Sequence, residues 1–368
     1  MELKRINMPL KLISNRVTRT YTGGELIDKF LGNNNPKDNN KPEVWIGSII
    51  EAKNEEKSKT NEGLSYVEVF GDKYLLKDVI EKNAEFFLGE KHLKKYGMNT
   101  ALLVKMLDSS ERLTIQVHPT QIKAKDLFNS KFGKTEAWYI LDTRKIEDET
   151  PYILLGFKPE ITKTKWKNLF KKQDIKGMIN SLNKINVKPG EVYLVESGVP
   201  HAIGPGCFLI EIQEPTDYTI RVEKTTPSNK KISDELCHQG IGFEKMFDCF
   251  EYHGYNKTQI IKKWRKNKLN NINIKENIET VLIDYEDTPH FKMKLYDIFD
   301  TYKLYNKKEQ FSILTIISGK GKILWNDQVI NLKRGESFFL PAKINDIKII
   351  NKSDKNSISL LRCYPPSI

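Results

Sequence analysis

Residues 113–120, with the sequence LTIQVHPT, combine an alternating pattern with side chains that can bind a metal ion. In a β-strand, side chains two positions apart point to the same face, so Thr114, Gln116 and His118 are expected to share one face. Imidazole nitrogen is a common ligand of transition metals, and a neutral amide oxygen is a weaker one. The segment therefore predicts part of a metal site, with further ligands from elsewhere in the chain.

Two later segments offer those ligands. Glu136 lies in GKTEAWYI and His201 lies in PHAIG, each on or beside a predicted strand. The strands of a jelly roll bring such distant positions to one barrel interior. With Gln116 and His118, they give two imidazoles, one carboxylate and one amide, a set that suits zinc and also admits manganese or iron. One coordination position would remain open to water or substrate.

The elements that must position these residues are mostly strands. Strand patterns cover TALLVKML, LTIQVHP and TEAWYILDT, and two or three short strands joined by Gly and Pro turns follow in residues 186–222. Apolar residues at helical spacing occupy about 65–97 and 160–184. We therefore expect a catalytic jelly-roll domain over residues 1–255 that carries two helical insertions.

Strands also dominate the end of the chain, where Asn326-Asp327 separates two alternating runs and predicts a hairpin. Residues 332–344 repeat the logic of residues 187–203: a basic residue, a Gly-Glu turn, an apolar strand and a proline. Pro341-Ala342 stands where the first copy has Pro200-His201, and the last histidine is His290. We expect residues 256–368 to form a second jelly roll without metal ligands.

The composition narrows the class of protein. The chain has 368 residues, 39% of them hydrophobic, and a net charge of +12. The lysines are dispersed among acidic residues, so we expect no nucleic-acid partner, and an anionic small-molecule substrate would benefit from the positive charge. No signal peptide and no apolar stretch of membrane length is evident, which predicts a cytoplasmic protein without a membrane partner. Four widely spaced cysteines predict free buried thiols.

Four blocks in order carry a resemblance to a known family: QVHP, GKTEAWYI, PGEVYLVESGVPHAIG and EIQEPTDYTIRV. The chain resembles the class I mannose-6-phosphate isomerases in their short bacterial form, from about residue 8 to the C-terminal FFLPA. LLVKMLDSSERLTIQVHP and PEVWIGS are also similar to that family. The resemblance implies a mainly β fold of two cupin-type jelly rolls, in a monomer that interconverts mannose 6-phosphate and fructose 6-phosphate.

The resemblance also implies the roles of individual residues. One zinc ion per chain would bind Gln116, His118, Glu136 and His201. The positions that match the family's active site imply catalytic roles for Lys134, Asp217 and Arg221, and substrate contacts for Lys105 and Thr114. Two segments depart from the family: PEVWIGSIIEAKN lacks the usual His-Pro that follows, and CHQGIGFEKMFDCFEYHGYNK lies outside its motifs.

An aldose-ketose isomerase moves a proton between adjacent carbons through an enediol, so it must polarise a carbonyl, accept a proton and stabilise an oxyanion. Zinc-bound hydroxide, Asp217 and Lys134 are the alternatives for the base. A metal-dependent cupin oxygenase and a non-catalytic sugar-binding cupin are the alternative functions. No GxxxxGK[ST] motif occurs, which argues against a kinase.

Overall fold

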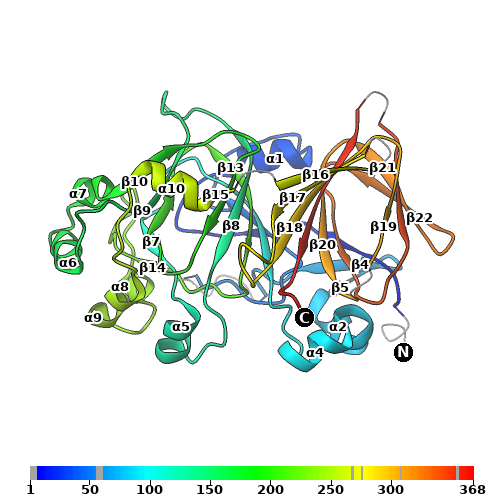
Figure 1. The fold of residues 1–368 in the computed structure, drawn as a ribbon, viewed down its shortest axis with the longest axis horizontal. Coiled ribbons are helices and arrows are strands. Elements are labelled where there is room, and N and C mark those ends of the chain that lie inside the picture. Colours follow the sequence, from blue (N-terminus) through cyan, green and yellow to red (C-terminus); the bar gives the residue numbers. More distant parts are fainter. Residues whose placement is uncertain (1–5, 55–60, 267–268, 275–276, 307–308, 354–355) are drawn as a thin grey trace.

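The computed structural model consists of two jelly rolls that lie side by side, at the left and the right of Figure 1. It describes residues 6–54, 61–266, 269–274, 277–306, 309–353 and 356–368. Each jelly roll pairs two sheets around an apolar interior. The predicted mainly β fold with cupin-type domains is confirmed.

The first jelly roll pairs a seven-stranded sheet, in the order β15-β11-β8-β13-β6-β3-β2, with a five-stranded sheet, in the order β10-β9-β12-β7-β14. The strands are β2 (Arg16–Val17), β3 (Glu43–Ile46), β6 (Leu103–Asp108), β7 (Gln116–Val117), β8 (Glu136–Thr143), β9 (Tyr152–Phe157), β10 (Leu182–Asn186), β11 (Val192–Val195), β12 (His201–Ile203), β13 (Cys207–Gln213), β14 (Ile220–Arg221) and β15 (Arg265–Lys266).

Side-chain alternation explains how the seven-stranded sheet is buried on both faces. On β8, Trp138 and Ile140 pack into the interior between the two sheets. Ala137 and Tyr139 point the other way, into a second core that is shared with the C-terminal jelly roll. A strand covered on both faces reads as a nearly continuous apolar run, as β8 does.

The second jelly roll pairs a nine-stranded sheet, in the order β16-β17-β18-β25-β20-β23-β1-β4-β5, with a four-stranded sheet, in the order β19-β24-β21-β22. The strands are β1 (Leu10–Ile13), β4 (Tyr66–Val69), β5 (Asp72–Leu75), β16 (Leu269–Ile274), β17 (Asn277–Ile283), β18 (Lys292–Ile298), β19 (Thr301–Leu304), β20 (Ser312–Ser318), β21 (Lys320–Trp325), β22 (Gln328–Lys333), β23 (Ser337–Leu340), β24 (Ile347–Asn351) and β25 (Ile358–Tyr364).

The hairpin predicted at Asn326-Asp327 is confirmed. It joins β21 to β22, and both turn residues have positive φ angles, 43° and 62°. Two such residues in succession match the turn whose twist fits a two-residue hairpin.

Three N-terminal strands belong to the sheet of the second jelly roll. β1 pairs with β23, with Leu10 opposite Phe339, and β4 pairs with the other side of β1. The expected boundary between two domains at residues 255 and 256 stays a prediction. The nine-stranded sheet contains strands from before and after that boundary. The helix predicted over residues 65–97 is wrong for the first part of that range. There, β4 and β5 form a hairpin, and β1 pairs with β4.

Most helices surround the first jelly roll, whereas α2 and α4 lie at the lower edge of the second (Figure 1). They are α1 (Glu25–Leu31), α2 (Leu76–Lys82), α3 (Ala84–Leu88), α4 (Glu90–Tyr96), α5 (Gln121–Phe128), α6 (Lys163–Lys172), α7 (Ile175–Asn180), α8 (Asp234–His238), α9 (Phe243–Met246) and α10 (Lys257–Trp264), with a 3₁₀ turn η2 (Phe247–Cys249). Trp166 and Phe170 of α6 are buried against the five-stranded sheet, as their spacing predicts. Among the described residues, no helix is long and apolar enough to cross a bilayer. All four cysteines are buried thiols, as predicted.

Candidate active site

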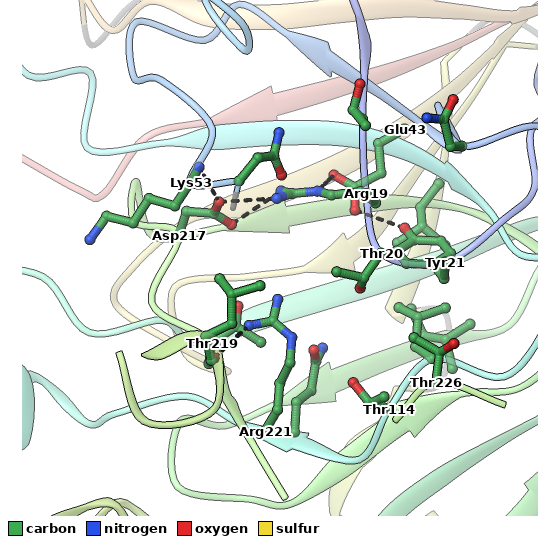
Figure 2. A pocket seen from close by; sticks show the side chains of 18 of the residues that line it. Arg19, Thr20, Tyr21, Glu43, Lys53, Thr114, Asp217, Thr219, Arg221 and Thr226 are labelled. Carbon is green, nitrogen blue, oxygen red and sulfur yellow. Dashed lines mark hydrogen bonds and ion pairs between the residues drawn. The ribbon is translucent and has the colours of Figure 1, made fainter. Parts of the chain in front are cut away.

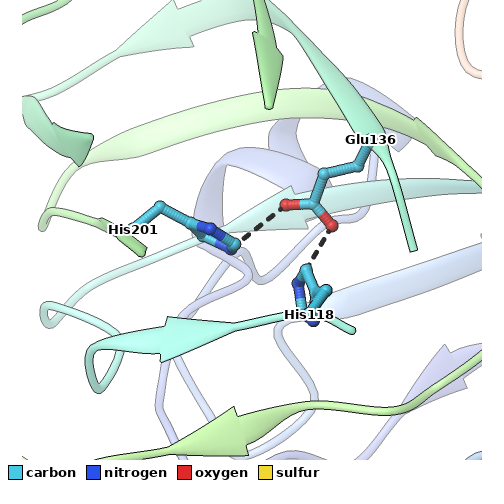
Figure 3. A group of neighbouring side chains, drawn as sticks. All are labelled: His118, Glu136 and His201. Carbon is cyan, nitrogen blue, oxygen red and sulfur yellow. Dashed lines mark ion pairs between the residues drawn. The ribbon is translucent and has the colours of Figure 1, made fainter. Parts of the chain in front are cut away.

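Three metal-binding side chains meet inside the first jelly roll. His118 follows β7 and His201 begins β12 in the five-stranded sheet, whereas Glu136 begins β8 in the facing sheet. Figure 3 shows both imidazoles beside the Glu136 carboxylate. His118 Nε2 lies 3.2 Å from Glu136 Oε2, and His201 Nε2 lies 3.4 Å from Glu136 Oε1. The candidate ligand atoms all lie within 4.8 Å of one another, so a single ion could contact all three side chains.

Backbone carbonyls fix the orientation of both imidazoles. His118 Nδ1 donates to the carbonyl of Tyr218 at 2.9 Å, and His201 Nδ1 donates to that of Val199 at 2.9 Å. Each Nε2 therefore keeps a lone pair, which is directed toward the space between the two imidazoles and Glu136. Burial, followed by the charge of Lys134, lowers the pKa of His118 to about 3, so this imidazole is neutral at physiological pH. Neutral imidazoles held at their second nitrogen are typical metal ligands.

Glu136 supplies a buried negative charge between the two imidazoles. Burial opposes that charge, but Lys134 and the imidazoles outweigh it and hold the pKa of Glu136 well below its ordinary value. Oε1 accepts a hydrogen bond from Trp138 Nε1 at 3.1 Å, whereas Oε2 accepts none among the described residues and lies 2.9 Å from Lys134 Nζ. Two neutral imidazoles and a buried carboxylate are a donor set typical of divalent transition metals. The three side chains therefore fit a divalent metal ion.

Gln116 and Lys134 extend this group toward a pocket. Gln116 lies opposite His201 in the β7–β12 pairing, and its Nε2 lies 3.2 Å from His201 Nε2. A half-turn of the carboxamide places its oxygen there instead. Lys134 Nζ donates to His118 Nε2 at 2.8 Å and lies 2.9 Å from Glu136 Oε2. The structure thus brings all four predicted ligands together, and their roles as ligands stay a prediction.

A pocket of about 280 Å³ adjoins the ligand group. Its lining includes every predicted catalytic and substrate-binding residue, which are Lys105, Thr114, Lys134, Asp217 and Arg221. Gln116 and three further charged residues, Arg19, Glu43 and Glu211, also line it. Figure 2 shows Arg19 and Asp217 pointing toward one another, with Arg221 and Thr114 on the other side of the pocket.

Asp217 is engaged by a residue that the sequence did not single out. Arg19 donates to both Asp217 oxygens at 3.1 Å, and the backbone N–H of Lys53 donates to Oδ2 at 2.9 Å. Burial opposes ionisation of Asp217, but Arg19 and Lys105 outweigh it and hold the carboxyl pKa well below its usual range. A carboxylate with this pKa is a weak proton acceptor at neutral pH. The arrangement suits Asp217 for orienting Arg19.

Arg221 is a half-buried cation on the pocket wall. Its Nη1 donates to the carbonyls of Thr219 and Leu236, each at 3.1 Å. No carboxylate of the described residues forms an ion pair with it, and burial lowers its pKa. A half-buried guanidinium with donors to spare is suited to an anionic substrate or a developing oxyanion.

Glu211 was also missed from the sequence. Its carboxylate lies 3.3 Å from Lys105 Nζ, and its Oε1 accepts no hydrogen bond among the described residues. Burial and then the charge of Glu136 raise its pKa. The sequence did carry a signal, because Glu211 follows Cys207 and Leu209 on the interior face of β13. Arg19 lies in a segment without such a pattern, so nothing local could have identified it.

Comparisons with protein families match two parts of the chain. Residues 11–167 match the phosphomannose isomerase type I catalytic domain, and residues 282–353 match the mannose-6-phosphate isomerase cupin domain.

Curated relatives carry the same description. A probable mannose-6-phosphate isomerase of Bacillus subtilis is 29% identical over 248 residues, which are 67% of this chain and 71% of the relative. A mannose-6-phosphate isomerase of Streptococcus mutans is 25% identical over 249 residues, 66% of this chain and 69% of the relative.

Solved structures share the whole fold. A mannose 6-phosphate isomerase from Bacillus subtilis superposes with a TM-score of 0.72 at 24% identity and covers 96% of this chain and 99% of its own. A zinc-bound mannose 6-phosphate isomerase superposes with a TM-score of 0.71 at 17% identity, over 98% of this chain and 100% of its own.

Proposed function

This chain belongs to the type I phosphomannose isomerases of the cupin superfamily, and on that premise we propose that it interconverts mannose 6-phosphate and fructose 6-phosphate with one zinc ion. The observation that carries the proposal is the meeting of His118, Glu136 and His201 beside a pocket lined by a half-buried Arg221 that forms no ion pair among the described residues. Gln116 and Lys134 connect the two, since each lines the pocket and contacts one of the imidazoles.

Four side chains would hold the metal: Gln116, His118, Glu136 and His201. When bound, zinc supplies Lewis acidity at a substrate oxygen. The chain's own residues perform the remaining tasks, which are binding, proton transfer and stabilisation of negative charge.

Isomerisation removes the proton from carbon 2 of the aldose and returns a proton to carbon 1 of the enediol. We assign the proton transfer to Glu211, because it lines the pocket, its Oε1 accepts no hydrogen bond among the described residues although it lies 3.3 Å from Lys105 Nζ, and its pKa is raised. A carboxylate of raised pKa accepts a proton more readily at neutral pH than the strongly acidic Asp217 does. Lys134 remains the alternative proton carrier from its position beside His118.

Arg221 and Lys134 would stabilise the negative charge that develops on the enediolate oxygens. Asp217 would hold Arg19 against the pocket wall through its two hydrogen bonds. Lys105 and Thr114 would contact the sugar phosphate. The monomeric state and the cytoplasmic location stay predictions.

The test is turnover of fructose 6-phosphate by zinc-loaded protein in deuterated water, with a chelated sample as control. Chelator-sensitive mannose 6-phosphate that carries deuterium at carbon 2 is the expected result. Sugar binding without product would instead favour the non-catalytic cupin, and oxygen consumption would favour the oxygenase.

A further inference from the structure

Glu214 is a buried carboxylate, 1% exposed, that the proposed mechanism does not use. It directly follows β13 and faces the segment that carries Lys134. Oε2 accepts a hydrogen bond from the N–H of Thr135 at 2.9 Å, and Oε1 accepts one from the N–H of Gly133 at 3.2 Å. One carboxylate thus holds the residue before Lys134 and the residue after it.

Further backbone contacts fix the same segment. The N–H of Glu214 donates to the carbonyl of Thr135 at 3.1 Å, and the N–H of Lys134 donates to the carbonyl of Pro119 at 3.2 Å. Thr216 Oγ1 donates to the carbonyl of Gly133 at 2.7 Å. These bonds hold the Lys134 backbone in place while its Nζ lies 2.8 Å from His118 Nε2.

The C-terminal jelly roll reaches this carboxylate. His290 lies in the turn between β17 and β18, and its Nδ1 lies 3.5 Å from Glu214 Oε1. Both His290 and Thr135 line a cavity of about 400 Å³ between the two jelly rolls. His290 therefore connects the second domain to the segment that carries Lys134.

We propose that Glu214 is a positioning residue for Lys134 and that His290 braces Glu214 from the C-terminal jelly roll. The inference rests on the proposed isomerase function and adds a role for the second domain. Replacing Glu214 by glutamine turns one acceptor oxygen into an amide that cannot accept from a backbone N–H. The variant would therefore lose one of the two hydrogen bonds that hold the backbone on either side of Lys134. A displacement of about 1 Å in a reacting group can lower the rate about a hundredfold.

A double-mutant cycle tests the link between Glu214 and Lys134, with kcat/KM and bound zinc measured for each variant. Glu214→Gln should lower kcat/KM at least about tenfold with unchanged zinc. In the Lys134→Met background, the same change should cost less than about twofold, because residues that act through one another are not additive. Glu251→Gln changes an exposed carboxylate of the same cavity and should leave kcat/KM unchanged.

A role limited to folding would give equal losses in both backgrounds, and that result would overturn the inference. Absence of wild-type turnover would instead overturn the proposed function.

His290→Gln provides a milder test at a turn on the molecular surface. We expect kcat/KM to fall about two- to fivefold in the wild type and to stay the same in the Glu214→Gln background. The matched control is His253→Gln, an exposed histidine of the same cavity that contacts the Tyr255 ring. Equal activity of the His290→Gln and His253→Gln variants would refute a bracing role for the C-terminal domain.

Discussion

His201 Nε2 lies 3.4 Å from Glu136 Oε1, although the two residues belong to facing sheets of the first jelly roll. The contact depends on both sheets, since β12 fixes the imidazole and β8 fixes the carboxylate. A metal ion held there would join the two sheets at their interior.

His201→Ala should lower bound zinc at least about tenfold, because the change removes a ligand while the other strands of the barrel remain paired. Zinc content by mass spectrometry and circular dichroism of the purified variant give the measurement. The His253→Ala variant, which changes an exposed histidine, is the control and should bind as much zinc as the wild type. A zinc content equal to that of the wild type would contradict the assignment of His201 as a ligand.

Arg221→Ala should retain zinc and lower kcat about 10²- to 10³-fold, because a charged donor to developing negative charge in the pocket is removed. Steady-state kinetics with fructose 6-phosphate measure the loss. Arg334→Ala, at an exposed position of the second jelly roll, should turn over at the wild-type rate. Wild-type kcat in the Arg221 variant would exclude Arg221 from the reaction.

Glu211→Gln should lower kcat about 10²- to 10⁴-fold and slow the entry of deuterium at carbon 2 equally, because the amide cannot accept the proton. Bound zinc should be unchanged. Glu244→Gln removes a surface carboxylate and should behave as the wild type. If deuterium enters at the normal rate in the Glu211 variant, Lys134 becomes the proton carrier.

Asp108 should make the free energy of unfolding fall as the pH rises from about 4 to 6. Burial raises its pKa to about 6, against the opposing effects of Arg144 and of the N–H groups of Leu26 and Gly24. Since the unfolded carboxyl titrates near 4, the native state binds the proton more tightly, and raising the pH through this window favours unfolding by up to about 3 kcal/mol.

The Asp108→Asn variant lacks this titration. Its free energy of unfolding from urea denaturation at several pH values, subtracted from that of the wild type, should trace the expected decline. Asp126→Asn, at an exposed position, should give a flat difference. A flat difference for Asp108→Asn as well would mean that Asp108 ionises normally in the native state.

The meeting of the candidate metal ligands could be predicted because short sequence patterns indicate it. The alternation in LTIQVHPT indicates that Gln116 and His118 share a face, although the paired strand β7 is only two residues long. Glu136 and His201 lie at the starts of strands, as their places on or beside predicted strands suggest.

The charged wall of the pocket could not be predicted in the same way. Arg19 reaches Asp217 only because β2 joins the edge of the seven-stranded sheet, a relation between segments far apart in the chain. The hairpin β4–β5 was mistaken for helix for a similar reason, since its pairing with β1 overrides the local spacing.

The pairing of β1 with β23 also sets an order of events in synthesis. β1 is synthesised well before β23, because Leu10 and its partner Phe339 are far apart in the chain. The nascent strand β1 must wait until β23 is made, and this long closure slows the formation of the sheet. A C-terminal half made alone would expose β23 as an unpaired edge, the kind of template on which chains aggregate.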